Sequence, residues 1–160
     1  MGAHVMKLKG FRAADAALLT GDWLPGELLG LPVVDRPPLA EPSRVPPPRD
    51  DRDELCVVPG TGFVRFTGVD WIHRHARLEI GLRSAAEDPR PVLEAALRHG
   101  FRVLGMRRLY GWLTPGVYDG TETVLKACGL QWEATVPQAL WVAGGTMDRQ
   151  LWGALHASDD

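Results

Sequence analysis

The sequence predicts a mixed α/β domain in which one mostly antiparallel sheet of six or seven strands is flanked by helices. Residues 76–83 alternate apolar and polar side chains, which is the period of a strand with one buried face. Residues 91–106 place leucines and a phenylalanine at helical spacing, so that one face is apolar. A second strand and helix are expected at 108–112 and 119–128, an order typical of helices packed on a sheet.

Further strands are expected at both ends of the chain. The expected elements are an opening strand at 5–11, a short helix at 16–19, a hairpin of 55–58 with 63–71, and a closing pair of 132–142 with 147–155. Between positions 32 and 48, seven of the seventeen residues are proline, which is unfavourable inside helices. Residues 32–53 are therefore expected to form a solvated connector or a lid within one domain of residues 1–160.

Composition limits the classes of protein to be considered. A length of 160 residues is typical of one domain, and a net charge of −2 gives no reason to expect nucleic acid as a partner. No apolar run has the length of a signal peptide or a membrane span, so no membrane association is expected. Cys56 and Cys128 have neither metal-binding nor disulfide spacing, which indicates a reduced, cytoplasmic setting.

Several motifs resemble those of a known family. They are Glu79-Ile80-Gly81, the helix ending at 126–130, the opening run at 5–16, and the C-terminal positions Glu133, Trp141, Gly144, Asp148 and Gly153. In these motifs the chain resembles the GCN5-related N-acetyltransferases, and more narrowly the branch of ribosomal-protein alanine acetyltransferases. The resemblance implies acetyl-CoA or another acyl-CoA as co-substrate and a small-molecule or peptide amine as acceptor. It also allows a homodimer.

Glu79 is the strongest candidate for a catalytic group. In the branch that the chain resembles, this glutamate lies in the acceptor cleft, where it acts as general base or orients the amine. The alternative is a structural ion pair with a nearby arginine such as Arg77. His73 is a second catalytic candidate, because histidine is the side chain that ordinarily exchanges protons near neutral pH. The His73-x-His75 pair lacks a third ligand at a recognisable spacing, so no metal is expected.

Four residues are candidates for contact with the substrate. Asp70 can bind an ammonium group, and Trp71 and Trp23 are expected near the acceptor pocket. Many members of the family protonate the leaving thiolate with a tyrosine, and Leu125 stands at that position here. Tyr118, near the start of the second helix, and Thr121 are candidate replacements for this tyrosine, and Tyr118 is the fourth residue expected to contact the substrate.

The expected cofactor loop departs most from the family. The resemblance places Leu82, Arg83, Ser84 and Arg90 at the acyl-CoA site, where the family has glycines whose backbone amides bind pyrophosphate at a helix N-terminus. Glu87 and Pro89 occupy the two glycine positions. The loop is therefore degenerate, and arginine side chains would have to act as clamps in place of amides.

Three hypotheses follow from these features. The first is an acyl-CoA-dependent N-acyltransferase that uses Glu79. The second is a protein of the same fold that no longer uses acetyl-CoA and performs other acid–base chemistry on, or binds, a small metabolite in the same cleft. The third is a non-catalytic partner protein in which Glu79 is structural.

Overall fold

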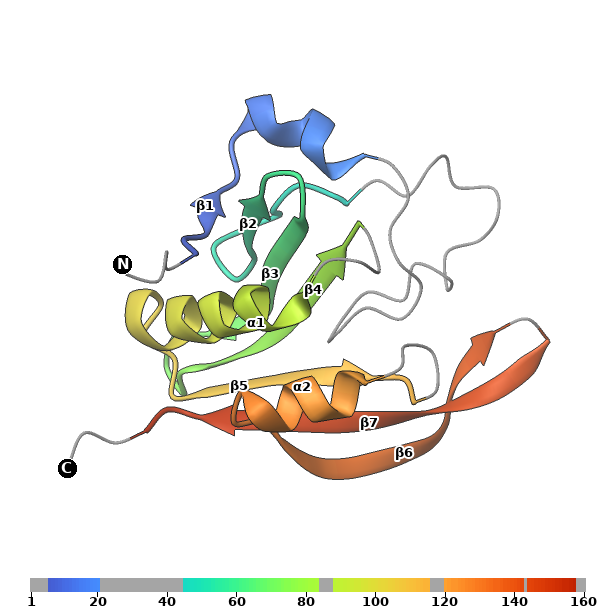
Figure 1. Ribbon diagram of the computed structural model, residues 1–160. Coiled ribbons are helices and arrows are strands. Elements are labelled where there is room, and N and C mark those ends of the chain that lie inside the picture. Colours follow the sequence, from blue (N-terminus) through green and yellow to red (C-terminus); the bar gives the residue numbers. More distant parts are fainter. Residues whose placement is uncertain (1–5, 21–44, 84–87, 116–119, 143, 158–160) are drawn as a thin grey trace.

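The computed structural model describes residues 6–20, 45–83, 88–115, 120–142 and 144–157. Its centre is a seven-stranded sheet in the order β1-β2-β3-β4-β5-β7-β6 (Figure 1). The strands are β1 (Lys9–Gly10), β2 (Glu54–Val58), β3 (Gly62–Asp70), β4 (His75–Leu82), β5 (Arg108–Leu113), β6 (Gln131–Val142) and β7 (Gly145–Leu155). All neighbours are antiparallel except β4 and β5, which are parallel. The predicted mixed, mostly antiparallel sheet is confirmed.

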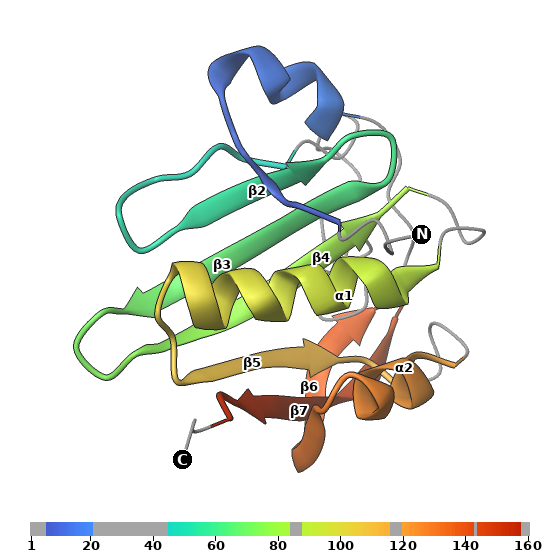
Figure 2. The ribbon, with the colours of Figure 1, turned by 60° about the vertical axis from the view of Figure 1, so that its left-hand side comes forward.

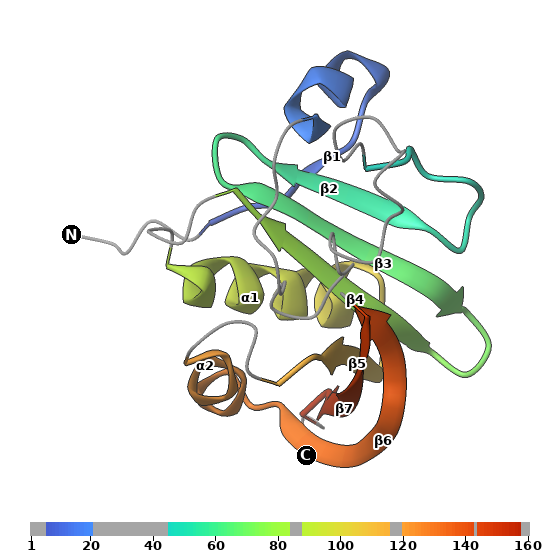
Figure 3. The same ribbon diagram turned by 90° about the vertical axis from the view of Figure 1, so that its right-hand side faces the viewer.

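The helices lie mainly on one face of this sheet. They are the 3₁₀ helix η1 (Ala13–Leu19), α1 (Pro89–Arg98), the π turn η3 (His99–Val103) and α2 (Thr121–Ala127). Helices α1 and α2 cover the same face, and η1 lies beyond the β2 edge (Figures 2 and 3). The single helix expected at 91–106 instead begins two residues earlier and changes to a π turn after Arg98. No helix among the described residues is long and apolar enough to cross a membrane.

Alternating side chains of the central strands form two hydrophobic clusters. On the helix side, β3 and β4 contribute Val64, Phe66, Leu78 and Ile80, which pack with α1 in the larger cluster. The smaller cluster contains Leu19, Val45, Leu55, Val57 and Phe63. The period of two along each strand therefore separates two packed faces, as the alternation at 76–83 predicts.

The two parallel strands separate after a short contact. Strand β4 pairs with β5 only through His75–Arg108, Ala76–Leu109 and Arg77–Tyr110. Beyond Arg77 the strands diverge toward their C-terminal ends (Figure 1). The sheet is therefore open at its centre, beside the residues that follow Arg77.

The C-terminal hairpin is joined to β5 by an ion pair. The guanidinium of Arg108 contacts both carboxylate oxygens of Glu133, at 2.5 and 2.7 Å. A Cβ at Gly153 would lie 2.3 Å from Oε1 of Glu133, so a larger residue there would displace this ion pair. Two positions that carried the family resemblance, Glu133 and Gly153, thus have a structural role in aligning β5, β6 and β7.

Candidate functional site

A polar cavity of about 440 Å³ lies between β3, β4 and the segment that precedes β2. It is on the side of the sheet opposite α1, because Arg65 and Glu79 alternate with the buried residues that contact the helix. The lining residues are Pro46, Arg49, Asp50, Arg52, Asp53, Arg65, Thr67, Gly68, Arg77 and Glu79. The cavity therefore brings together charged side chains from two strands and from the described end of the proline-rich region.

Glu79 is a buried carboxylate at the edge of this cavity. Its residue is 3 % exposed, and its Oε1 lies 3.2 Å from a guanidinium nitrogen of Arg77. The other oxygen, Oε2, is buried and accepts no hydrogen bond from the described residues. Burial raises the pKa of Glu79, although the nearby charges of Arg77, Arg65 and Arg149 act in the opposite direction. A carboxyl group with one unpaired oxygen and a raised pKa is a stronger proton acceptor than an ordinary glutamate.

Arg65 fixes the wall of the cavity. Its side chain is 4 % exposed and forms a two-point ion pair with Asp53, at 2.8 and 2.5 Å. The same guanidinium donates to the backbone carbonyl oxygens of Pro46 and Pro47, at 2.5 and 3.3 Å. Since Arg65 is directly opposite Glu79 in the β3–β4 register, it connects the segment of residues 46–53 to the candidate base.

Three other candidate residues lie at the turn between β3 and β4. Asp70 accepts hydrogen bonds from the backbone N–H groups of Ile72 and His73, and the bond from His73 is the main reason that the pKa of Asp70 is lowered. The indole N–H of Trp71 donates to the carbonyl oxygen of Asp51. Asp70, Trp71 and His73 are not among the residues that line the cavity of Glu79. In the described structure the contacts of Asp70 organise the turn, and Trp71 links the turn to Asp51.

The described members of the expected acyl-CoA site make contacts of their own. Leu82 is buried in the hydrophobic core. The guanidinium of Arg83 donates to the carbonyl oxygens of Leu18 and Thr20 at the end of η1. Arg90 forms an exposed ion pair with Glu94, one helical turn further on. The role of these residues in binding acyl-CoA stays a prediction.

The N-terminus of α1 offers few amides to an anion. Pro89 and Pro91 have no N–H group, and the N–H of Arg90 donates to the side chain of Asp88 at 3.0 Å. A free helix N-terminus would leave its first N–H groups available for a phosphate. At the first three positions of α1, these groups are absent or already bonded.

Some predicted positions lie outside the described residues. They are Trp23, Ser84, Glu87, Tyr118 and residues 32–44 of the proline-rich region. The predictions made for them stand as predictions.

Sequence reasoning missed the residues around Glu79 and a second polar cluster. Arg65 and Asp53 were not singled out, although a charged residue between Val64 and Phe66 in a strand is a signal of a polar inner face. The second cluster consists of Glu54, Cys56 and His99, whose ligand atoms lie within 4.8 Å of one another. His99 is 43 residues from Cys56, so no local spacing could reveal this cluster.

The sheet order, the separated parallel strands and the helices on one face are matched by solved structures of N-acetyltransferases. A mutant of the spermidine N-acetyltransferase SpeG from Vibrio cholerae superposes with a TM-score of 0.70 at 15% identity, over 94% of this chain and 95% of that chain. The same enzyme in complex with CoA and spermine gives a TM-score of 0.61 at 18% identity, over 66% of each chain. No family model matches the sequence. No curated protein matches it either.

Proposed function

We propose that the protein is an acyl-CoA-dependent N-acyltransferase in which Glu79 acts as general base or orients the amine. The observation that carries this proposal is the buried Glu79 carboxylate, with an unpaired oxygen, beside a cavity in a sheet of N-acetyltransferase fold. The solved structures of similar fold include an enzyme with CoA and an amine bound, which supports acetyl transfer as the reaction.

In the proposed reaction, Glu79 removes a proton from the acceptor ammonium through Oε2. The neutral amine then attacks the acyl carbonyl carbon of the thioester, the C–S bond breaks, and the proton that the attacking nitrogen loses passes to the thiolate, so that CoA leaves as the thiol. Arg77 holds Oε1 of Glu79, so that the carboxylate keeps one orientation while its other oxygen receives the proton. Arg77 is therefore a positioning residue for the base.

The electrostatics of the cavity favour an acceptor that carries an anionic group. Four arginines line the cavity (Arg49, Arg52, Arg65 and Arg77) against three carboxylates (Asp50, Asp53 and Glu79), which leaves a net charge of 4 − 3 = +1. A polyamine would bring several positive charges into this environment. We therefore propose an amine with a carboxylate or phosphate, such as an amino acid or the N-terminus of an acidic peptide, as the acceptor.

A panel of amines with acetyl-CoA tests this proposal by the rate of CoA release. An amine that bears a carboxylate is expected to have a kcat/KM at least about tenfold higher than that of spermidine, because like charges in the cavity oppose the polyamine. Arg52→Gln should reduce the preference, whereas Arg102→Gln, at an exposed position outside the cavity, should not. A preference for spermidine would contradict the assignment of the acceptor, and a lack of activity on every amine would contradict the acyl transfer.

A second candidate function is supported by the N-terminus of α1. Because its first amides are absent or bonded to Asp88, a pyrophosphate finds no ready site there. In this second function the cavity performs acid–base chemistry on a small metabolite without acyl-CoA, with Glu79 again as the base.

The cytoplasmic location and the homodimer remain proposals that rest on the sequence.

A further inference from the structure

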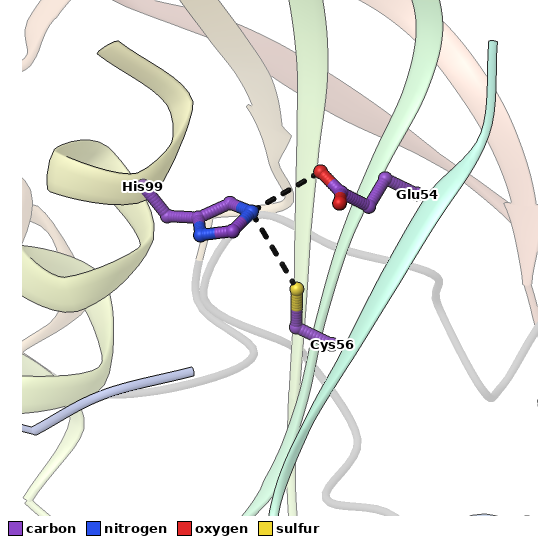
Figure 4. Close-up of side chains that lie close together, drawn as sticks. All are labelled: Glu54, Cys56 and His99. Carbon is purple, nitrogen blue, oxygen red and sulfur yellow. Dashed lines mark hydrogen bonds and ion pairs between the residues drawn. The ribbon is translucent and has the colours of Figure 1, made fainter. Parts of the chain in front are cut away.

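A second group of polar side chains lies on the helix side of the sheet, away from Glu79. Glu54 and Cys56 are two residues apart on β2 and so project from the same face, and His99 follows the last residue of α1. Nε2 of His99 is 3.1 Å from Oε2 of Glu54 and 3.8 Å from Sγ of Cys56. Figure 4 shows the side chains of Glu54 and Cys56 directed at Nε2 of His99.

The end of α1 is shaped to bring His99 to β2. The helix widens into a π turn at His99, where the N–H of Leu104 donates to the carbonyl oxygen of His99 at 3.0 Å. Gly100 allows the turn to lie against the sheet, because a Cβ there would be 2.6 Å from Leu109 and 2.9 Å from Phe66. The imidazole of His99 packs on Phe66, with ring centroids 5.6 Å apart. Local π turns of this kind are frequent at functional sites.

Hydrogen bonding alone leaves the cluster incompletely satisfied. When Nε2 of His99 carries a proton, it can donate to Glu54 but cannot accept from the thiol of Cys56. When Nε2 has no proton, it can accept from the thiol but then faces the carboxylate of Glu54, lone pair to lone pair. A single cation in place of the proton could bind Glu54, Cys56 and His99 together, and no lone pairs would then face each other.

We propose that Glu54, Cys56 and His99 form a binding site for a divalent cation of the zinc type. Tetrahedral zinc with Cys, His and carboxylate ligands places sulfur and nitrogen about 3.6 Å apart and nitrogen and oxygen about 3.3 Å apart. The two corresponding separations here are 3.8 and 3.1 Å, each within a few tenths of an ångström of these values, and all three ligand atoms lie within 4.8 Å of one another. The cation would join β2 to the end of α1, 43 residues further along the chain.

The donor set and its exposure favour zinc over calcium or magnesium. A thiolate and an imidazole are soft or intermediate ligands, which hard cations with oxygen preference bind poorly. The Cys56 side is fully buried, whereas the side chain of Glu54 is 38% exposed, so a fourth ligand can come from water on the Glu54 side.

Metal titration of the purified, chelator-treated protein tests this site. With Co²⁺ as a spectroscopic probe, we expect one equivalent to bind with a thiolate-to-cobalt charge-transfer band and the intense visible bands of a tetrahedral site. With Zn²⁺ in about hundredfold excess over its Kd, the Tm should rise by about 5 °C or more. Both measurements use the intact chain and are independent of any acyl transfer.

Variants separate this site from accidental metal binding. Cys56→Ser should remove the charge-transfer band, and His99→Gln should weaken binding by about a hundredfold or more. Cys128→Ser removes the chain's other cysteine and should leave both signals unchanged. Glu54→Gln changes a partly exposed side chain and should weaken binding in a protein that still folds. Absence of one-to-one binding to the unsubstituted protein, or a charge-transfer band that survives Cys56→Ser, would overturn the proposal.

Discussion

Replacement of Glu79 by glutamine is expected to lower kcat about 10²–10⁴-fold while the protein becomes more stable. The rate falls because the amide cannot accept the proton of the acceptor amine. The stability rises because burial makes the ionised carboxylate unfavourable, which is why the pKa of Glu79 is raised in the folded protein. At pH 8 we expect the Tm to increase by about 2–4 °C, as is common when a strained active-site group is neutralised. Initial rates and thermal unfolding of the same preparation measure both effects.

The stability difference should depend on pH in a defined direction. The folded protein holds the proton of Glu79 more tightly than the unfolded chain does, because the pKa is raised on folding. The stability contributed by this group is therefore present at acid pH and is lost as the pH rises from the ordinary range of a glutamate through the raised value. Glu79→Gln lacks this loss, so the two unfolding curves should converge at acid pH.

A structural role for Glu79 predicts a different result. If the carboxylate served only to pair with Arg77, its neutralisation would destabilise the fold and leave the rate unaffected at temperatures where the protein is folded. Glu94→Gln is a matched control, since it removes a carboxylate from an exposed ion pair with Arg90. This control should change the Tm by less than about 2 °C.

Replacement of Arg65 by alanine is expected to cost about 3–5 kcal/mol of unfolding free energy. The substitution leaves the Asp53 carboxylate without its partner and the carbonyl oxygens of Pro46 and Pro47 without their donor. It also detaches the segment of residues 46–53 from β3. Urea denaturation followed by far-UV circular dichroism measures this loss.

Two further variants test whether the broken Arg65–Asp53 ion pair causes this loss of stability. Arg52→Ala removes an exposed arginine from the same cavity and should cost less than about 0.5 kcal/mol. The double variant Asp53→Asn with Arg65→Met removes both charges, and it should recover part of the loss because no uncompensated charge remains buried. An Arg65→Ala variant as stable as Arg52→Ala would contradict this account of the cavity wall.

The sheet was largely predictable because its signals are local. Alternation at 76–83 and the helical stripe that includes Leu93 and Leu97 placed β4 and α1 to within two residues at their starts. The end of α1 was wrong, because a π turn around Gly100 depends on contacts with Phe66 and Leu109 from other strands. A local pattern contains no information on such contacts.

The site was less predictable than the fold for the same reason. Glu79 could be singled out, since it follows an apolar residue in a strand and belongs to a recognisable tripeptide. Its surroundings depend on β3, which brings Arg65 opposite to it, and on Asp53 from the preceding segment. The cluster of Glu54, Cys56 and His99 forms only when β2 meets the end of α1, so its residues have no common spacing.

The central claim, that the protein uses acyl-CoA, is tested most directly by calorimetric titration with acetyl-CoA and with free CoA. We expect saturable binding with a Kd of about micromolar and a stoichiometry of one. Glu79→Gln should bind equally well, because its proposed role is toward the amine. No heat of binding and no thermal stabilisation at millimolar acetyl-CoA would contradict the claim, and the cavity of Glu79 would then belong to an enzyme that acts without acyl-CoA.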